Sequence, residues 1–298
     1  MLVKDGRYRE VCIPEDLYQE LREVVAERDR LVQRLISINN QVERWLDIHF
    51  PEFQTIFSDW RGKAAFATLR HFPTPGKIVA AGAEEIEAVW KTTMKRSAGL
   101  KRAKELVKAA AESIGRKTGL AAAEASLQNL LTENELYNEQ YEQLEQLMMD
   151  LLKQVPNAEK LLDIKGVGLI TAATFVGEVG RISRFQDPRQ IQKLAGFNLV
   201  ENSSGKHKGK TRISRRGRRR LRHGLFMAMI TILATNQEFR MLHKRNLTRE
   251  KNPLTKMQSI SALCGKLIRI FYGLLRTGAD YSAEKMLSDI ELGMRVVV

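Results

Sequence analysis

A serine next to a glycine stands at the start of the most basic stretch of this sequence. Ser204 precedes Gly205, and Lys206, Lys208 and Lys210 follow closely. A serine that attacks a phosphodiester needs cationic groups around it, because they stabilise the charge of the pentavalent transition state and favour the alkoxide. A serine in such a loop is more often only a phosphate contact. The residues alone leave both interpretations open.

The basic stretch runs from Lys206 to Arg222 and contains ten basic residues and no acidic one. Its members are Lys206, Lys208, Lys210, Arg212, Arg215, Arg216, Arg218, Arg219, Arg220 and Arg222. The chain has a formal net charge of +14, so this stretch carries most of the excess. A solvated surface normally mixes both signs of charge. The stretch therefore predicts a surface that binds the phosphates of a nucleic acid; a targeting signal or a sticky tail is the competing interpretation.

Two other kinds of active site find little support. A two-metal nuclease needs several carboxylates that converge on one site, whereas the acidic residues here are interleaved with lysine and arginine on two long predicted helices. Glu178 can be interpreted as a helix surface group as readily as anything else. His207, His223 and His243 have no spacing that predicts an acid–base pair, so we expect them in solvent or against phosphates.

The overall composition is that of a folded protein. The 298 residues are 43% hydrophobic and 28% charged, which excludes general disorder. No segment approaches the roughly 20 apolar residues of a membrane-spanning helix, and the first residues lack the apolar core of a signal peptide. Cys12 and Cys264 are the only cysteines, which excludes a disulfide framework and a cysteine zinc site. We expect a cytoplasmic protein with no membrane partner.

Two long helices are predicted in the first half of the chain. From Pro14 to Trp45, apolar residues alternate at steps of four and three, with Arg28 at one core position. A second pattern of the same kind covers about residues 121–155, with Asn134 at one core position. Such heptads are typical of coiled coils, and a polar core residue can fix the register or the pairing state.

The segment between the long helices is expected to be a connector followed by short helices. A proline cluster lies at residues 72–76, and short helices over residues 83–118 are broken at Gly99 and Gly115. The long helices can pair with each other in an antiparallel hairpin, or each can pair with its copy in a second chain and form a homo-oligomer. The sequence leaves both pairings open.

Two glycines mark a turn soon after Pro156. Residues 161–172 are expected to form a helix, a tight turn at Gly166 and Gly168, and a second helix, which exposes backbone N–H groups where a phosphate can bind. The arrangement resembles a helix-hairpin-helix, which clamps the DNA backbone; a plain helix turn is the alternative. A dinucleotide-binding fold is excluded because there is no third glycine in register.

Three more helices are predicted downstream. Asp187 is a suitable N-cap, and Gly196 ends the helix that follows. A polar loop over residues 198–216 leads to a helix at about 217–236 that carries arginines in its first turns. Arginines there oppose the helix dipole, which makes sense if phosphates bind them. A last amphipathic helix covers residues 256–275. The expected fold class is all-α.

Several motifs resemble one known family. Residues 161–172, 185–197, 202–209 and 213–222 resemble the C-terminal domain of IS110-family transposases, and residues 45–48 and 50–53 resemble the coiled-coil linker of that family. In the family, a serine eight residues after an Ala-Gly pair is the recombination nucleophile. Counting from Gly196, the resemblance implies that Ser204 is this nucleophile, with Ser203 as the fallback.

The family also has an N-terminal RuvC-like domain whose four acidic residues bind Mg²⁺, and its members act as oligomers on DNA with a structured guide RNA. Residues 1–13 look like the end of that domain, and Asp5 does not replace its acidic residues. The resemblance thus implies DNA and guide RNA as partners, and Mg²⁺ only where the acidic domain is supplied. It leaves open a truncated element, a late start, a subunit that needs the acidic domain in trans, and a catalytically inactive DNA/RNA-binding remnant or accessory subunit.

The expected organisation follows from these motifs. Its four parts are a remnant of the acidic domain at residues 1–13, a coiled-coil and helical linker at 14–156, the transposase C-terminal domain with its helix-hairpin-helix at 157–280, and a tail at 281–298. Ser204 is the expected catalytic residue. Gly166, Gly168 and the ten basic residues are the expected nucleic-acid contacts, and no metal ligand is expected.

Overall fold

The computed structural model describes residues 16–94, 99–200, 203–204, 207–208 and 212–287. The expected remnant at residues 1–13, with Cys12, and the end of the expected tail lie outside this range. Nearly all regular structure in the described residues is helical, and the strands are two residues long each. The expected all-α fold class is confirmed. No helix in the described ranges is long and apolar enough to cross a membrane.

The chain divides into two compact units. We call residues 28–143 the helical unit, and residues 16–27 with 144–287 the C-terminal unit. The divisions fall inside the two long helices, α1 (Asp16–His49) and α6 (Leu120–Gln154). Both helices agree closely with the expected ranges, because a heptad pattern is a local signal that the sequence carries in full.

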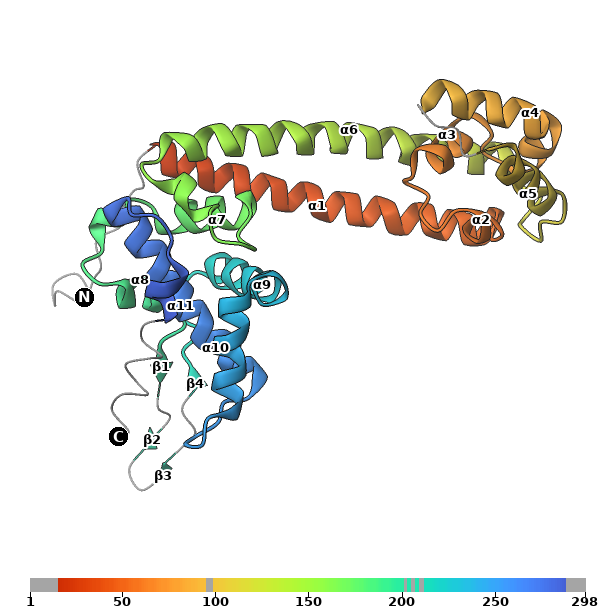
Figure 1. The fold of residues 1–298 in the computed structure, drawn as a ribbon. Helices are drawn as coiled ribbons and strands as arrows, with labels where there is room; N and C mark the ends of the chain where they lie inside the picture. Colours follow the sequence, from red (N-terminus) through yellow and green to blue (C-terminus); the bar gives the residue numbers. More distant parts are fainter. Residues whose placement is uncertain (1–15, 95–98, 201–202, 205–206, 209–211, 288–298) are drawn as a thin grey trace. The chain divides into compact units, whose positions relative to one another are not determined.

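The two long helices pair within the chain. In the helical unit, α1 and α6 lie side by side (Figure 1). Nε1 of Trp45 donates to the backbone oxygen of Ala123 at 2.8 Å, and Nη2 of Arg28 donates to Oη of Tyr141 at 3.1 Å. The residue later in α1 contacts the residue earlier in α6, and the reverse holds for the other pair. This order is that of an antiparallel hairpin. Of the two pairings left open by the sequence, the structure contains this one. Asn134 is buried, as its core position predicts.

Four shorter helices complete the helical unit: α2 (Phe53–Ile56), α3 (Lys63–His71), α4 (Pro75–Thr93) and α5 (Leu100–Ala111). α4 packs against α3 and α5. Trp90 lies in the core, and its Nε1 donates to Oγ1 of Thr68 at 2.9 Å. The expected break at Gly99 is confirmed, since α5 begins at the next residue.

The C-terminal unit is built around α7 (Leu169–Val179), in which every residue from Ala172 to Val179 is buried. The other helical elements are η1 (Ala158–Leu161), η2 (Ile182–Arg184), α8 (Pro188–Ala195), α9 (Arg219–Thr235), α10 (Gln237–Thr248) and α11 (Lys256–Thr277). α7 packs on α9, and Phe175 meets Phe271 of α11 edge-to-face at 4.8 Å between ring centroids. The expected helices at 188–195, 217–236 and 256–275 correspond to α8, α9 and α11.

The described residues of the expected polar loop at 198–216 include four short strands. β1 (Leu199–Val200) pairs antiparallel with β4 (Arg212–Ile213), and β2 (Ser203–Ser204) pairs antiparallel with β3 (His207–Lys208). We call residues 199–213 the ribbon. In Figure 1, β1 and β4 lie nearer the helices, and β2 and β3 lie further out. The strands were not predicted from the sequence, because each is only two residues long and has no alternating apolar pattern.

Candidate nucleic-acid interface

Backbone hydrogen bonds fix the base of the ribbon between α8 and α9. α8 ends at Gly196 in the left-handed conformation, as expected. The backbone nitrogen of Arg215 donates to the oxygen of Gly196 at 3.1 Å, and that of Arg218 donates to the oxygen of Leu194 at 2.8 Å. Gly217 has a φ of 141°, and a Cβ there would lie 2.3 Å from the Leu194 oxygen. Only glycine fits this close approach without a backbone shift.

Arg222 closes the same base through its side chain. Its Nη1 donates to the backbone oxygens of Ala195 at 3.1 Å and Arg215 at 3.0 Å. Both carbonyls belong to the segments that enter and leave the ribbon. Arg222 was expected on a phosphate, but this nitrogen is engaged with the protein, so the side chain braces the ribbon.

Arg218 also has protein partners. It is the N-cap of α9, and its Nη1 donates to the backbone oxygen of Glu178 and lies 3.4 Å from the Oε2 of that residue. Glu178 is 2% exposed, so its interpretation as a helix surface group is wrong. Burial lowers the pKa of Arg218, and the positive charge of Arg22 lowers it further, whereas Glu178 acts in the opposite direction.

Glu178 has two further guanidinium neighbours. Nε of Arg22 on α1 lies 3.5 Å from its Oε1, and Nη1 of Arg220 lies 3.8 Å from the same atom. The contact between Arg22 and Glu178 was not predicted, because these residues are far apart in the chain. No local motif links them.

Among the expected basic contacts whose side chains the structure describes, four are exposed: Arg212, Arg215, Arg216 and Arg219. They lie on the last strand of the ribbon, at its base and in the first turn of α9. Lys206 and Lys210 fall outside the described residues, and Lys208 is described by its backbone position in β3. The structure thus divides the basic stretch into exposed cations near the ribbon and arginines that also hold the protein together.

Ser204 lies in β2, and its partner across the ribbon is His207 in β3. Ser203 is paired in the same way with Lys208. The spacing of the histidines predicted no acid–base pair, because spacing along the chain does not reveal a cross-strand neighbour.

The glycine turn differs in part from a helix-hairpin-helix. Its first helix is η1, a single 3-10 turn that ends at Leu161, and turns follow up to α7. Leu161, Ile164 and Val167 are all buried, and a repeat of three suits 3-10 geometry better than an α-helix.

The two glycines themselves have different surroundings. Gly166 has a φ of 96°, and a Cβ there would lie 2.6 Å from Oγ1 of Thr235, so the turn packs on α9. Gly168 is exposed at the start of α7, where a Cβ would meet nothing within 4 Å. Gly168 is therefore the member of the pair whose surroundings leave room for a phosphate, and Gly166 has a packing role.

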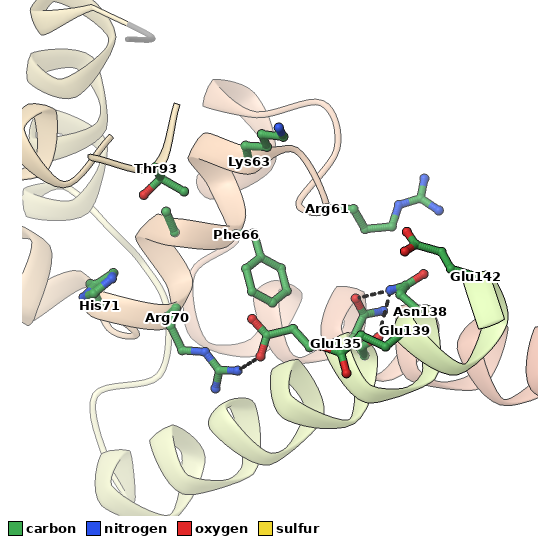
Figure 2. A pocket seen from close by; sticks show the side chains of 12 residues that line it. Arg61, Lys63, Phe66, Arg70, His71, Thr93, Glu135, Asn138, Glu139 and Glu142 are labelled. Atoms are coloured by element: carbon green, nitrogen blue, oxygen red, sulfur yellow. Dashed lines mark hydrogen bonds and ion pairs between the residues drawn. The ribbon is translucent and has the colours of Figure 1, made fainter. Parts of the chain in front are cut away.

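The helical unit has a cavity of about 510 Å³ between α3 and α6 (Figure 2). Arg70 crosses it to form an ion pair with Glu135, and also donates to Oε1 of Gln128 and Oγ1 of Thr132, both at 3.0 Å. Further along, Nδ2 of Asn138 donates to the backbone oxygen of Asn134 at 2.8 Å. The contacts of Arg70 hold α3 against α6. Because charged side chains of both signs line the cavity, it is poorly suited to bind an anion.

The described residues contain no group of three or more His, Cys, Asp and Glu side chains placed to hold a metal ion. The acidic side chain nearest the ribbon base in the contacts above is Glu178, and it is occupied by arginines.

Comparison with known proteins identifies the segment that carries this interface. Residues 158–244 match the model of the "Transposase IS116/IS110/IS902 family". This segment is similar to the transposase domain of that family. The matched segment begins with η1, contains the ribbon and all of α9, and ends within α10. The resemblance deduced from the motifs is confirmed for this part of the chain.

A curated relative agrees with this assignment. The "Insertion element IS110 uncharacterized 43.6 kDa protein" of Streptomyces coelicolor is 27% identical over 155 residues. The match covers 52% of this chain and 37% of the relative. The chain therefore aligns with well under two thirds of that protein.

Proposed function

We propose that this chain acts in DNA transposition or site-specific recombination, and that Ser204 attacks a DNA phosphodiester. The observation that carries the proposal is the match of residues 158–244 to a transposase family, because Ser204 lies inside that segment, in β2. The resemblance found in the motifs supports the choice of Ser204, and Ser203 is the fallback.

The exposed cations suit a polyanionic partner. Arg212, Arg215, Arg216 and Arg219 are exposed along the ribbon and at the first turn of α9. Guanidinium groups pair with phosphate oxygens in a bidentate manner, and such contacts hold the backbone without reading its sequence. We infer that they hold the DNA or the guide RNA against the ribbon.

Serine is a weak nucleophile unless a base takes its proton. His207 is the backbone partner of Ser204 in the antiparallel pair of β2 and β3. Histidine is the residue that most often acts as a general base. We infer that His207 accepts the Ser204 proton.

The proposed chemical step exchanges one phosphoester bond for another. As the bond from Oγ of Ser204 to phosphorus forms, the serine proton passes to the His207 imidazole. The bond from phosphorus to one deoxyribose oxygen breaks, and the departing oxygen takes a proton from solvent. The cations of the basic stretch stabilise the phosphate charge that builds up.

Other parts of the proposal come from the resemblance. They are a structured guide RNA, assembly as a homo-oligomer, and Mg²⁺ bound by an acidic domain. An antiparallel hairpin within the chain does not need a second copy for its pairing, so we infer that oligomer contacts use other surfaces.

A recombination assay tests the proposal. The chain is incubated with DNA that carries the ends and the target of its element, with the element's RNA, with Mg²⁺ and with an acidic domain supplied in trans, and new DNA junctions are amplified. We expect junctions with the natural chain and with Ser203→Ala, and none with Ser204→Ala. Binding of DNA without junctions, in the presence of the acidic domain, would favour the binding remnant instead.

A further inference from the structure

The buried carboxylate of Glu178 faces more positive charge than it can neutralise. It lies within 4 Å of guanidinium nitrogens from Arg22, Arg218 and Arg220. A Cβ on Gly180, two residues after Glu178, would lie 3.5 Å from Nη1 of Arg184 of η2, so this guanidinium lies beside the end of α7. Its charge also lowers the pKa of Arg218, after the larger effects of burial and of Arg22. We call these four arginines the arginine cluster.

The arginine cluster is open to solvent on one side. The side chains of Arg22, Arg218 and Arg220 are 35%, 31% and 38% exposed, whereas Glu178 is 2% exposed. Like charges that are gathered around one carboxylate repel each other, and this repulsion weakens folding unless an anion offsets it. The cluster therefore has the charge and the access that suit a phosphate.

Two glycines allow the helices to approach closely enough to form the cluster. A Cβ on Gly177 would lie 3.0 Å from the backbone nitrogen of Arg22, so α7 touches the backbone of α1 one residue before Glu178. A Cβ on Gly224 would lie 3.0 Å from Cγ2 of Thr174, so α9 also lies close to α7. Both distances are shorter than most Cβ contacts in proteins. The close packing of α1, α7 and α9 therefore depends on glycine at these two positions.

The roles of the four arginines differ. Arg218 is tied to the backbone oxygen of Glu178 as well as to its carboxylate, so it acts with Glu178 as a fixed support. Arg22 meets Glu178 through Nε, the inner nitrogen of the guanidinium. Arg184 is exposed, and its guanidinium lies 5.7 Å from the centroid of the Phe185 ring.

We propose that Arg22 and Arg184, with Arg220, form a second phosphate-binding site for a nucleic-acid backbone, positioned by Glu178 and Arg218. This site lies outside the basic stretch in two of its three members and brings the start of α1 into contact with the nucleic acid. The inference rests on the proposed function only in taking a nucleic acid as the partner, and does not depend on Ser204.

Salt dependence of binding tests the site directly. The full chain is titrated by fluorescence anisotropy against a random DNA duplex of about 20 base pairs and against an RNA hairpin of similar size. Each phosphate contact adds about 0.9 to the slope of log K against log salt on duplex DNA. We expect Arg22→Gln and Arg184→Gln each to reduce that slope by about 0.9. This corresponds to about a 3.5-fold smaller loss of affinity between about 50 and 200 mM NaCl.

A matched control and a folding control accompany the titration. Arg44→Gln changes an exposed arginine on the same helix as Arg22 but outside the cluster, and should leave the slope unchanged. Circular dichroism checks that Arg22→Gln folds. Arg184→Gln keeps the Glu178 contacts intact, so it tests the site even if Arg22→Gln misfolds.

The two probes separate the possible sources of the phosphate. A reduced slope with the duplex, with the hairpin, or with both supports the site and identifies its partner. A slope with Arg184→Gln equal to that of the natural chain on both probes would overturn the site, as would a natural chain that binds neither probe. If Arg219→Gln reduces the slope while Arg184→Gln and Arg22→Gln do not, the ribbon interface stands and only the second site is lost.

Discussion

The buried carboxylate of Glu178 lies 3.4 Å from Nη1 of Arg218, and the same nitrogen donates to the backbone oxygen of Glu178. Because Arg218 is the N-cap of α9, this contact joins the end of α7 to the start of α9. The ribbon that carries Ser204 enters and leaves the fold beside that junction. A buried charge that loses its partners is costly, so the junction should be sensitive to substitution.

Removing the carboxylate tests the junction. Glu178→Ala leaves the half-buried Arg218 without its counter-charge, so we expect the free energy of unfolding to fall by about 2 kcal/mol. This value is smaller than that for a fully buried ion pair, because the arginines are about one-third exposed and solvent screens their charges. Urea unfolding followed by circular dichroism measures the change. Glu250→Ala, at an exposed position, is the control and should stay within about 0.5 kcal/mol of the natural chain. Equal midpoints for both variants would contradict this role of Glu178.

Gly217 should tolerate no side chain. A Cβ there would lie 2.3 Å from the Leu194 oxygen, and its φ is 141°, so Gly217→Ala must shift the base of the ribbon at a cost of about 2 kcal/mol or more. Gly273→Ala is the matched control, because a Cβ there meets nothing within 4 Å inside α11. It should be neutral or stabilising by up to about 1 kcal/mol. Thermal melting compares them, and a Gly217→Ala midpoint at the control's value would refute the close approach.

Cys264 should be inert in the folded chain. Burial raises the pKa of its thiol to about 12, so almost no thiolate exists at about pH 8. In a Cys12→Ser variant, we expect a thiol reagent to label Cys264 only after unfolding in urea. Because the pKa of this thiol is higher in the folded chain than in the unfolded chain, its contribution to the free energy of unfolding is fully present below the unfolded pKa. That contribution is lost as the pH rises through the folded pKa. Rapid labelling of the native variant would show that Cys264 is accessible.

His207 should affect the rate of the reaction and leave binding intact. If it accepts the Ser204 proton, His207→Ala should slow covalent capture of DNA by about 100-fold or more while the affinity for DNA changes little. Added imidazole should restore part of the rate, because a free base can occupy the vacated space. His223→Ala, an exposed histidine on α9, serves as the control. An unchanged rate in His207→Ala would remove the base from the proposal but leave Ser204 in it.

The sequence predicted those parts of the fold whose signals are local. The heptads located α1 to within about four residues and α6 to within about one, and the caps at Asp187 and Gly196 located α8. α10 has no comparable signal, because it is mostly polar. Its N-cap is Asn236, whose side chain accepts from the backbone nitrogen of Phe239 at 3.1 Å, and the same residue ends α9. A single predicted helix end therefore concealed a second helix.

The site was predictable only as a stretch of residues. Its charge and its serine are visible in the sequence. The sequence does not reveal which arginines are exposed and which form hydrogen bonds or ion pairs within the protein. Glu178 is separated from Arg22 by most of α1 and all of the helical unit, and burial depends on packing between such distant segments. The pairing of Ser204 with His207 depends on strand register, which two-residue strands scarcely encode.

The most direct test of Ser204 as the nucleophile is to find the atom of the protein that becomes bonded to DNA. The chain is incubated with its element's DNA, RNA and Mg²⁺ and with an acidic domain supplied in trans, the reaction is stopped in denaturant, and the nucleotide-linked peptide is sequenced by mass spectrometry. We predict a phosphodiester on Ser204, lost in Ser204→Ala and kept in Ser203→Ala. An adduct on another residue, or one that survives Ser204→Ala, would contradict the assignment of Ser204 as the nucleophile.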